Sequence, residues 1–135
     1  LTHEMAKRAC ESFLSWVDER KPQFILSEKK IYSRKHNYAG TLDFTCVIDG
    51  ILYLGDLKTS NAFYPEMMFQ VSAYKEARQE EFPEEHYGGR LIARCGKDGS
   101  FEAIILTDEE QHNKDFEAFL GAYKAYLRLE ELKKQ

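Results

Sequence analysis

The residues best suited to chemistry are two aspartates and a lysine in two β-rich runs, which Asp49-Gly50 joins. Asp-Gly is the dipeptide that best tolerates the positive φ angles of a tight type I′ turn. If it forms the turn, Asp43 lies directly opposite Asp56, and Lys58 lies two residues further along the same face. Directly opposed side chains have Cβ atoms about 4.5–5.5 Å apart, a distance at which like charges are unfavourable.

Something must offset this repulsion, and the candidates are a bound cation, the Lys58 ammonium, or protonation of one acid. A divalent cation fits best, because Mg²⁺ is typically held by one or two carboxylates and completes its shell with water and substrate phosphate. Lys58 would then stand beside the metal-bound water. This arrangement is that of a phosphodiester hydrolase.

An acid-x-lysine tripeptide carries little information alone, because Glu28-x-Lys30 and Glu131-x-Lys133 match it as well as Asp56-x-Lys58. The match at 131–133 falls in a helical charge run, where a spacing of two does not place both side chains on one face. Only Asp56-x-Lys58 combines a strand, a core flank and a second acid across the hairpin. The alternative is an Asp–Lys pair that serves packing alone, although buried charge is a poor source of stability.

Glu28 is the next candidate. If residues 34–37 form a four-residue hairpin loop, Glu28 lands opposite Asp43, and three carboxylates lie in a row across adjacent strands. The alternative is an exposed strand glutamate between lysines.

The helix expected after Lys58 carries Gln70 and Tyr74, which lie four residues apart and so share one face. Their amide and phenol could orient a scissile phosphate or a nearby base, or could form the amphipathic edge of a core helix. Thr59 and Ser60 could contact phosphate through hydroxyl or backbone N–H groups, or could be turn residues.

These residues need elements that bring the hairpin and the following helix together. The pattern predicts a helix over 3–19, a strand over 24–33, the hairpin over 41–58, a helix over 65–80, strands over 89–95 and 101–106, and a closing helix. Thr107 and Glu110 are the expected capping box of that last helix. One hairpin face carries Leu42, Phe44, Cys46 and Ile48, and the other carries Val47, Leu52 and Leu54. Both hairpin strands are therefore central, in an α/β (α+β) fold with a mixed sheet of about five strands flanked by helices.

A chain of 135 residues with 43% hydrophobic content predicts one domain over residues 1–135, and its start at Leu1 suggests a piece of a longer protein. No apolar run approaches the roughly 20 residues that span a bilayer, and no signal peptide opens the chain, so we expect a soluble intracellular protein. The three cysteines lack the spacings of a zinc or iron–sulfur site and are expected to be structural thiols.

The formal charge of −4 argues against a protein that coats nucleic acid by bulk electrostatics, but not against a local basic track. Such a track could run over Lys29, Lys30, Arg34 and Lys35 and guide a DNA strand. The alternative is a solvated basic face.

Three short motifs occur in order between residues 38 and 74. Residues 38–43 (Tyr-Ala-Gly-Thr-Leu-Asp) contain G-x-x-D, residues 55–60 (Gly-Asp-Leu-Lys-Thr-Ser) contain D-x-K-T/S, and residues 70–74 (Gln-Val-Ser-Ala-Tyr) contain Q-x-x-x-Y. Together they resemble the PD-(D/E)XK nucleases, in the RecB-like and phage exonuclease branch. The expected order of elements, α-β-β-β-α-β-β-α, also resembles the restriction-endonuclease-like core of that superfamily.

The resemblance implies that Asp43 and Asp56 ligate Mg²⁺ or Mn²⁺, together with the Leu57 backbone carbonyl. Lys58 would orient or help to deprotonate the attacking water and counter charge in the transition state. Glu28 fits an acid often found on the preceding strand. Some relatives hold an iron–sulfur cluster, which the cysteine spacing argues against here.

The resemblance further implies that Gln70 and Tyr74 position DNA, and Thr59 and Ser60 are expected to assist them. We therefore expect metal-dependent, exonuclease-like hydrolysis of DNA in the cytoplasm of a bacterial or phage-infected cell, with RNA a less favoured substrate. An oligomer, or a helicase or recombination partner, is conceivable by family analogy. The alternatives are a non-catalytic nucleic-acid-binding module on the same fold, and a structural domain whose Asp/Asp/Lys cluster is neutralised internally.

Overall fold

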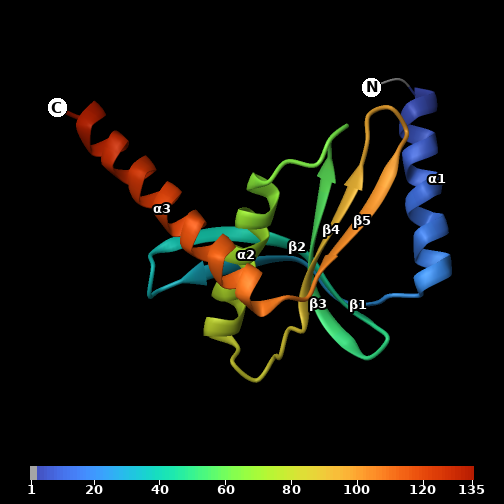
Figure 1. Ribbon diagram of the computed structural model, residues 1–135, viewed down its shortest axis with the longest axis horizontal. Coiled ribbons are helices and arrows are strands. Elements are labelled where there is room, and N and C mark those ends of the chain that lie inside the picture. The colour runs from blue at the N-terminus through green and yellow to red at the C-terminus, as the bar shows by residue number, and fades with distance from the viewer. Residues whose placement is uncertain (1–2) are drawn as a thin grey trace.

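The computed structural model describes residues 3–135, and within them five strands form one mixed sheet with three helices packed against it (Figure 1). The elements are α1 (His3–Arg20), β1 (Gln23–Ser33), β2 (Tyr38–Ile48), β3 (Ile51–Thr59), α2 (Glu66–Glu81), β4 (Gly89–Cys95), β5 (Phe101–Leu106) and α3 (Glu109–Lys133). The sheet order is β1-β2-β3-β4-β5. The predicted fold class and order of elements are confirmed.

The β2–β3 hairpin turns at Asp49-Gly50, where φ is +51° and +79°. Two positive φ angles are the signature of the type I′ turn, whose twist matches that of the flanking strands. The ladder runs from Ile48↔Ile51 to Phe44↔Gly55, as the turn predicts.

The two faces of the sheet carry separate cores. One face packs on α2 and α3, and its buried cluster includes Leu54, Val71 and Ile92. The other face packs on α1 through Trp16, around a cluster that includes Cys46. Figure 1 shows the sheet between these two layers of helices.

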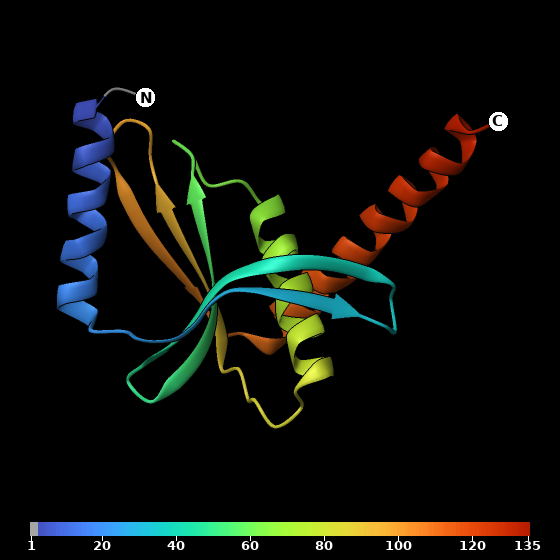
Figure 2. The same ribbon diagram turned by 180° about the vertical axis from the view of Figure 1, so that it is seen from behind.

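The β1–β2 hairpin bends at Asp43. Residues two apart on a regular strand face the same side of a sheet, yet Leu42 belongs to the α2-side cluster and Phe44 to the α1-side cluster. The expectation that Leu42 shares the face of Phe44 is therefore wrong. The outer half of the hairpin curves away from the sheet and crosses α2, as Figure 2 shows from behind.

Helix α2 connects the parallel strands β3 and β4, which pair from Tyr53↔Gly89 to Thr59↔Cys95. Pro65 is the N-cap residue, with φ of −55°, and suits this place because it has no backbone N–H to leave unpaired. This crossover brings Gln70 of α2 into contact with Lys58, near the C-terminal end of β3.

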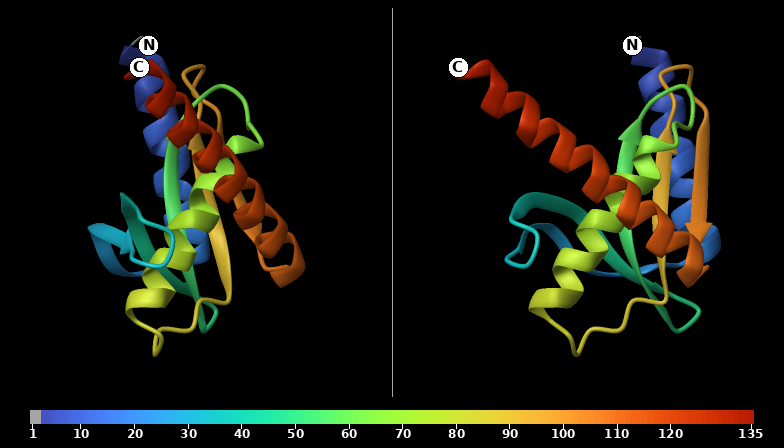
Figure 3. Two further views of the ribbon diagram at one scale, coloured as in Figure 1. Left: turned by 90° about the vertical axis from the view of Figure 1, so that its left-hand side faces the viewer. Right: turned by 60° about the vertical axis from the view of Figure 1, so that its left-hand side comes forward.

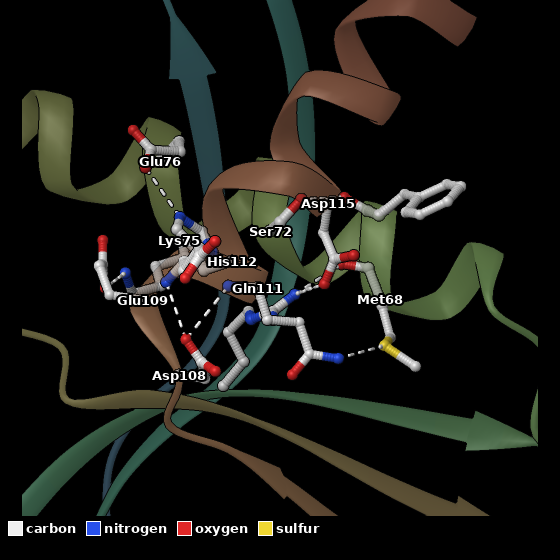
Figure 4. A network of polar contacts seen from close by, with 12 residues as sticks. Met68, Ser72, Lys75, Glu76, Asp108, Glu109, Gln111, His112 and Asp115 are labelled. Atoms are coloured by element: carbon white, nitrogen blue, oxygen red, sulfur yellow. Dashed lines mark hydrogen bonds and ion pairs between the residues drawn. The ribbon is translucent and has the colours of Figure 1, made fainter.

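A network of buried polar groups fastens α3 to α2 and β4 (Figure 4). Arg90, which is 1% exposed, donates to the Asp115 carboxylate at 2.8 Å, and His112 Nε2 lies 2.8 Å from Glu76 Oε1. Asp108 caps α3, because its carboxylate accepts the N–H groups of Glu110 and Gln111. The predicted Thr107 cap is therefore wrong by one residue, since the aspartate next to it is the stronger acceptor.

The C-terminal half of α3 extends beyond the sheet (Figure 3) and exposes Tyr126 and Leu129. No helix within residues 3–135 is both long and apolar enough to cross a membrane.

Candidate active site

Asp43 on β2 and Asp56 on β3 lie one position beyond Phe44↔Gly55, the last pair of the β2–β3 ladder. Asp43 Oδ2 accepts a hydrogen bond from the Leu57 N–H at 2.7 Å, which fixes that carboxylate across the hairpin. Asp56 is 3% exposed. Its burial, and then the adjoining Asp43 carboxyl, raise its pKa to about 7. The Asp43 carboxyl expected opposite Asp56 therefore adds to burial, which is the larger cause of the raised pKa.

Lys58 links this acid to α2. Its Nζ lies 3.0 Å from Asp56 Oδ2 and donates a hydrogen bond to Gln70 Oε1. Gln70 Nε2 in turn donates to the Tyr74 hydroxyl at 2.8 Å. The Lys58 charge lowers the pKa of Asp56, but less than burial and Asp43 raise it. Sheet and helix thus share one line of polar contacts, which runs from Asp56 to Tyr74.

Two glycines make this arrangement possible. A Cβ atom at Gly40 would lie 2.8 Å from the ring of Tyr74, and one at Gly55 would lie 2.1 Å from the ring of Phe44. Contacts this short do not occur between real side chains, so each aromatic ring needs a glycine beneath it. Gly40 therefore lets Tyr74 approach the hairpin next to the aspartates.

The donor set suits a hard cation. Asp56 Oδ2 is buried, and its one close polar contact among residues 3–135 is the ion pair with Lys58 Nζ at 3.0 Å. A bound cation can satisfy such an oxygen, and Mg²⁺ needs only one or two carboxylates from a protein. No group of three or more His, Cys, Asp or Glu residues within 3–135 could hold a metal. The protein's contribution to such a site is therefore the facing pair Asp43 and Asp56.

Glu28 lies beside the aspartates but outside the ladder. The expected loop over 34–37 is confirmed by the pair Ser33↔Tyr38, and Glu28 occupies the unpaired step between Lys29↔Leu42 and Ser27↔Phe44. Its φ is +49°, an uncommon conformation for a glutamate. Its exposed side chain lines one cavity together with Asp43. It stands near the carboxylate pair without joining a three-acid group.

Thr59 and Ser60 lie at the end of β3. Thr59 lines a groove against α1, on the sheet face opposite Lys58. The Ser60 hydroxyl donates to the Ala62 carbonyl at 2.8 Å, and the Ser60 N–H donates to the Cys95 carbonyl. Ser60 therefore already has local hydrogen-bond partners, and Thr59 faces away from Lys58.

The basic side chains are exposed along the bent hairpin. Lys29 and Lys30 lie on β1 next to Glu28. Arg34 and Lys35 lie at the β1–β2 turn, where their backbone N–H groups donate to the Glu80 carboxylate. Five residues of strand separate that turn from Asp43, a distance of roughly 17 Å, so the two pairs lie at different distances from the site.

One feature of the site was not predicted from the sequence. A cavity of about 420 Å³ opens beside Asp43, and Phe24, Leu26, Phe44 and Leu57 form most of its wall. The available signal was the apolar run 24–26 on an exposed edge strand.

The sheet order and the flanking helices define a restriction-endonuclease-like α+β fold. A proposed exonuclease from Eubacterium rectale superposes on this chain with a TM-score of 0.60 and 12% sequence identity, over 92% of this chain and 53% of its own. The crystal structure of SSO0001 gives a TM-score of 0.43 at 11% identity, over 84% of this chain and 57% of its own. The chain thus spans about half the length of these structures, and the likeness to the first shows a shared fold. No model of a protein family and no curated protein matches the chain.

Proposed function

We propose that this chain is a nuclease domain of the PD-(D/E)XK type, which hydrolyses DNA phosphodiester bonds with Mg²⁺ or Mn²⁺. The observation that carries the proposal is a buried Asp56 carboxylate that faces Asp43 on one side and contacts Lys58 at 3.0 Å on the other. The fold shared with a proposed exonuclease and the three motifs in order support it.

Asp43, Asp56 and the Leu57 carbonyl would hold the cation. Bound there, the cation supplies Lewis-acid stabilisation, a lowered pKa of bound water, and orientation of the phosphate. Burial, and then the adjoining Asp43 carboxyl, raise the pKa of Asp56, and a bound cation would favour the charged form of both acids. Glu28 would act with the two aspartates, and its position on the wall of the cavity that Asp43 also lines supports this role.

Lys58 would orient or help to deprotonate the attacking water and counter the charge that develops in the transition state. Gln70 would orient the Lys58 ammonium by accepting its hydrogen bond. The Tyr74 hydroxyl accepts a hydrogen bond from the Gln70 amide and would orient that amide in turn. In this account Gln70 and Tyr74 also position the DNA strand. The structure offers less support for Thr59 and Ser60 as DNA-positioning residues. Thr59 lies on the sheet face opposite Lys58, and the Ser60 hydroxyl already donates to the Ala62 carbonyl.

A cleavage assay tests the proposal. The protein is incubated with end-labelled linear, circular and single-stranded DNA, with EDTA, Mg²⁺ or Mn²⁺. We expect cleavage only with metal, its loss in Asp56→Asn, and a decrease on the order of 100- to 1,000-fold in Lys58→Ala. Products from circular DNA would distinguish an endonuclease from an exonuclease.

Matched variants control for folding. Asp49→Asn makes the same chemical change on the same hairpin, at a turn position that asparagine tolerates, and Lys124→Ala removes an exposed lysine on α3. Both should cleave as wild type does. DNA binding without any cleavage would favour the non-catalytic module, and absence of both would favour a structural domain with a neutralised cluster.

A further inference from the structure

The cavity beside Asp43 has a composition that the proposed hydrolysis does not explain. Its apolar wall comes from Phe24, Leu26, Phe44 and Leu57, and its volume of about 420 Å³ is within the range of small-molecule sites. Phe24 and Leu57 are 46% and 45% exposed. Large apolar side chains that are half-exposed around one cavity indicate a binding site for an apolar group of a ligand.

The aromatic part of this wall is held in place. The Phe24 ring packs edge-on against Phe44, with centroids 5.5 Å apart and an angle of 75° between the planes. Phe44 is itself 9% exposed and lies over Gly55, where no side chain can compete for the space. Phe24 is thus an exposed ring on a fixed support, which suits it to stacking.

The charges of the cavity favour a ring over a phosphate. The charged side chains on its wall are Glu28 and Asp43, which are both acids. Inside the cavity, away from the cation that Asp43 and Asp56 would hold, the Glu28 carboxylate would repel an anionic phosphate, whereas a neutral heteroaromatic ring could pack on Phe24 and meet the polar groups at the rim. Ser27 adds a hydroxyl to that rim.

Asp43 connects the cavity to the carboxylate pair, because its side chain lines the cavity and it lies opposite Asp56 in the hairpin register. We propose that the cavity receives an unpaired nucleobase of the nucleotide whose phosphate lies at Asp43 and Asp56. This inference rests on the proposed nuclease function and specifies its substrate. A base inside a duplex is stacked and paired and must leave the stack to enter a pocket, so the substrate is single-stranded or frayed DNA.

The experiment compares binding of single-stranded DNA with binding of a blunt duplex of the same sequence, by fluorescence anisotropy in Ca²⁺, which takes oxygen ligands as Mg²⁺ does. The strand carries 2-aminopurine, whose emission falls when it stacks on an aromatic ring. Wild type should bind the single strand more tightly and quench the probe. Phe24→Ala should weaken single-strand binding by about 5- to 100-fold and restore emission, because stacking on one aromatic side chain is worth 1–3 kcal/mol per base.

Ile25→Ala is the matched control, because Ile25 is 50% exposed on the same strand and does not line the cavity. It should bind as wild type does, and Phe24→Tyr should retain the quenching. If Phe24→Ala binds and quenches as wild type does while wild type cleaves DNA with Mg²⁺, the base site is refuted and the nuclease function stands. If wild type neither binds nor cleaves DNA, both proposals fail together.

Discussion

The ring of Tyr74 on α2 occupies the space that a side chain at residue 40 on β2 would need, with only 2.8 Å between its Cε1 atom and a Cβ placed at Gly40. This close approach seats α2 against the hairpin at the level of the two aspartates. The Tyr74 hydroxyl then accepts from Gln70, which holds Lys58. A backbone position without a side chain therefore helps to set the geometry of the lysine.

Gly40→Ala should force the Tyr74 ring to move and destabilise the protein by about 1–3 kcal/mol, as overpacking does. In a Tyr74→Ala background the same Gly40→Ala change should cost less stability, because the ring that the new Cβ would meet is absent. Chemical denaturation measures both effects. Gly121→Ala, where an added Cβ meets nothing within 4 Å on α3, should instead be neutral or stabilising by up to about 1 kcal/mol. Additive effects at Gly40 and Tyr74 would contradict the contact.

The stability of the metal-free protein should fall as pH rises from about 4 to about 7. Burial and Asp43 raise the pKa of Asp56 to about 7 in the folded state, so the folded protein binds the Asp56 proton more tightly than the unfolded chain does. The stability that this proton contributes is present at low pH and is lost as pH passes the folded pKa. Its size is on the order of a few kcal/mol.

Urea unfolding of wild type and Asp56→Asn in EDTA, at pH 5 and pH 8, isolates this effect. The variant has no carboxyl to titrate, so its stability should change less between the two values than that of wild type. Parallel changes in the two proteins would show that Asp56 titrates in its ordinary range.

Asp115→Ala should destabilise the fold by about 3–5 kcal/mol, because it leaves the Arg90 guanidinium buried without a counter-ion. Arg90 Nε and Nη2 already lack hydrogen-bond partners among residues 3–135, and the Met68 carbonyl, which also accepts from Nη1, carries no charge that could replace the carboxylate. Glu110→Ala, which removes an exposed ion pair with Lys114 on the same helix, should cost less than about 1 kcal/mol. Thermal unfolding would contradict the account if the two variants melted together.

Binding of DNA should weaken steeply with salt if the basic hairpin guides the strand. Replacing Lys29 or Lys30 by Gln should reduce the slope of log K against log salt by about 1 each, because each phosphate contact releases counterions. Arg34→Gln should matter less for a short oligonucleotide, because the turn lies further from Asp43. An unchanged slope in Lys29→Gln and Lys30→Gln would identify these lysines as solvated surface.

Local rules were enough to predict the hairpin that carries the aspartates. Asp49-Gly50 fixes the turn type, and the turn type fixes the register, so the position of Asp43 relative to Asp56 follows from neighbouring residues alone. The order of helices and strands could be predicted from the spacing of apolar residues, which is also a local property of the sequence.

What could not be predicted depends on contacts between distant residues. Alternation assigns faces only on a straight strand, and the bend at Asp43 moves Leu42 to the α2 side. The cavity beside Phe24 is lined by residues from β1, β2 and β3, and the pairing of Arg90 with Asp115 joins β4 to α3. The apolar run 24–26 is the one local signal for the cavity, and it does not indicate which residues of β2 and β3 complete the wall.

Calorimetric titration with Mn²⁺ tests most directly whether Asp43 and Asp56 form a cation site. Wild type and Asp49→Asn should each bind Mn²⁺ with the same affinity, and Asp56→Asn should lose that binding while it remains folded. Equal Mn²⁺ binding by Asp56→Asn and wild type would contradict the central claim, because the carboxylate pair would then not be the site.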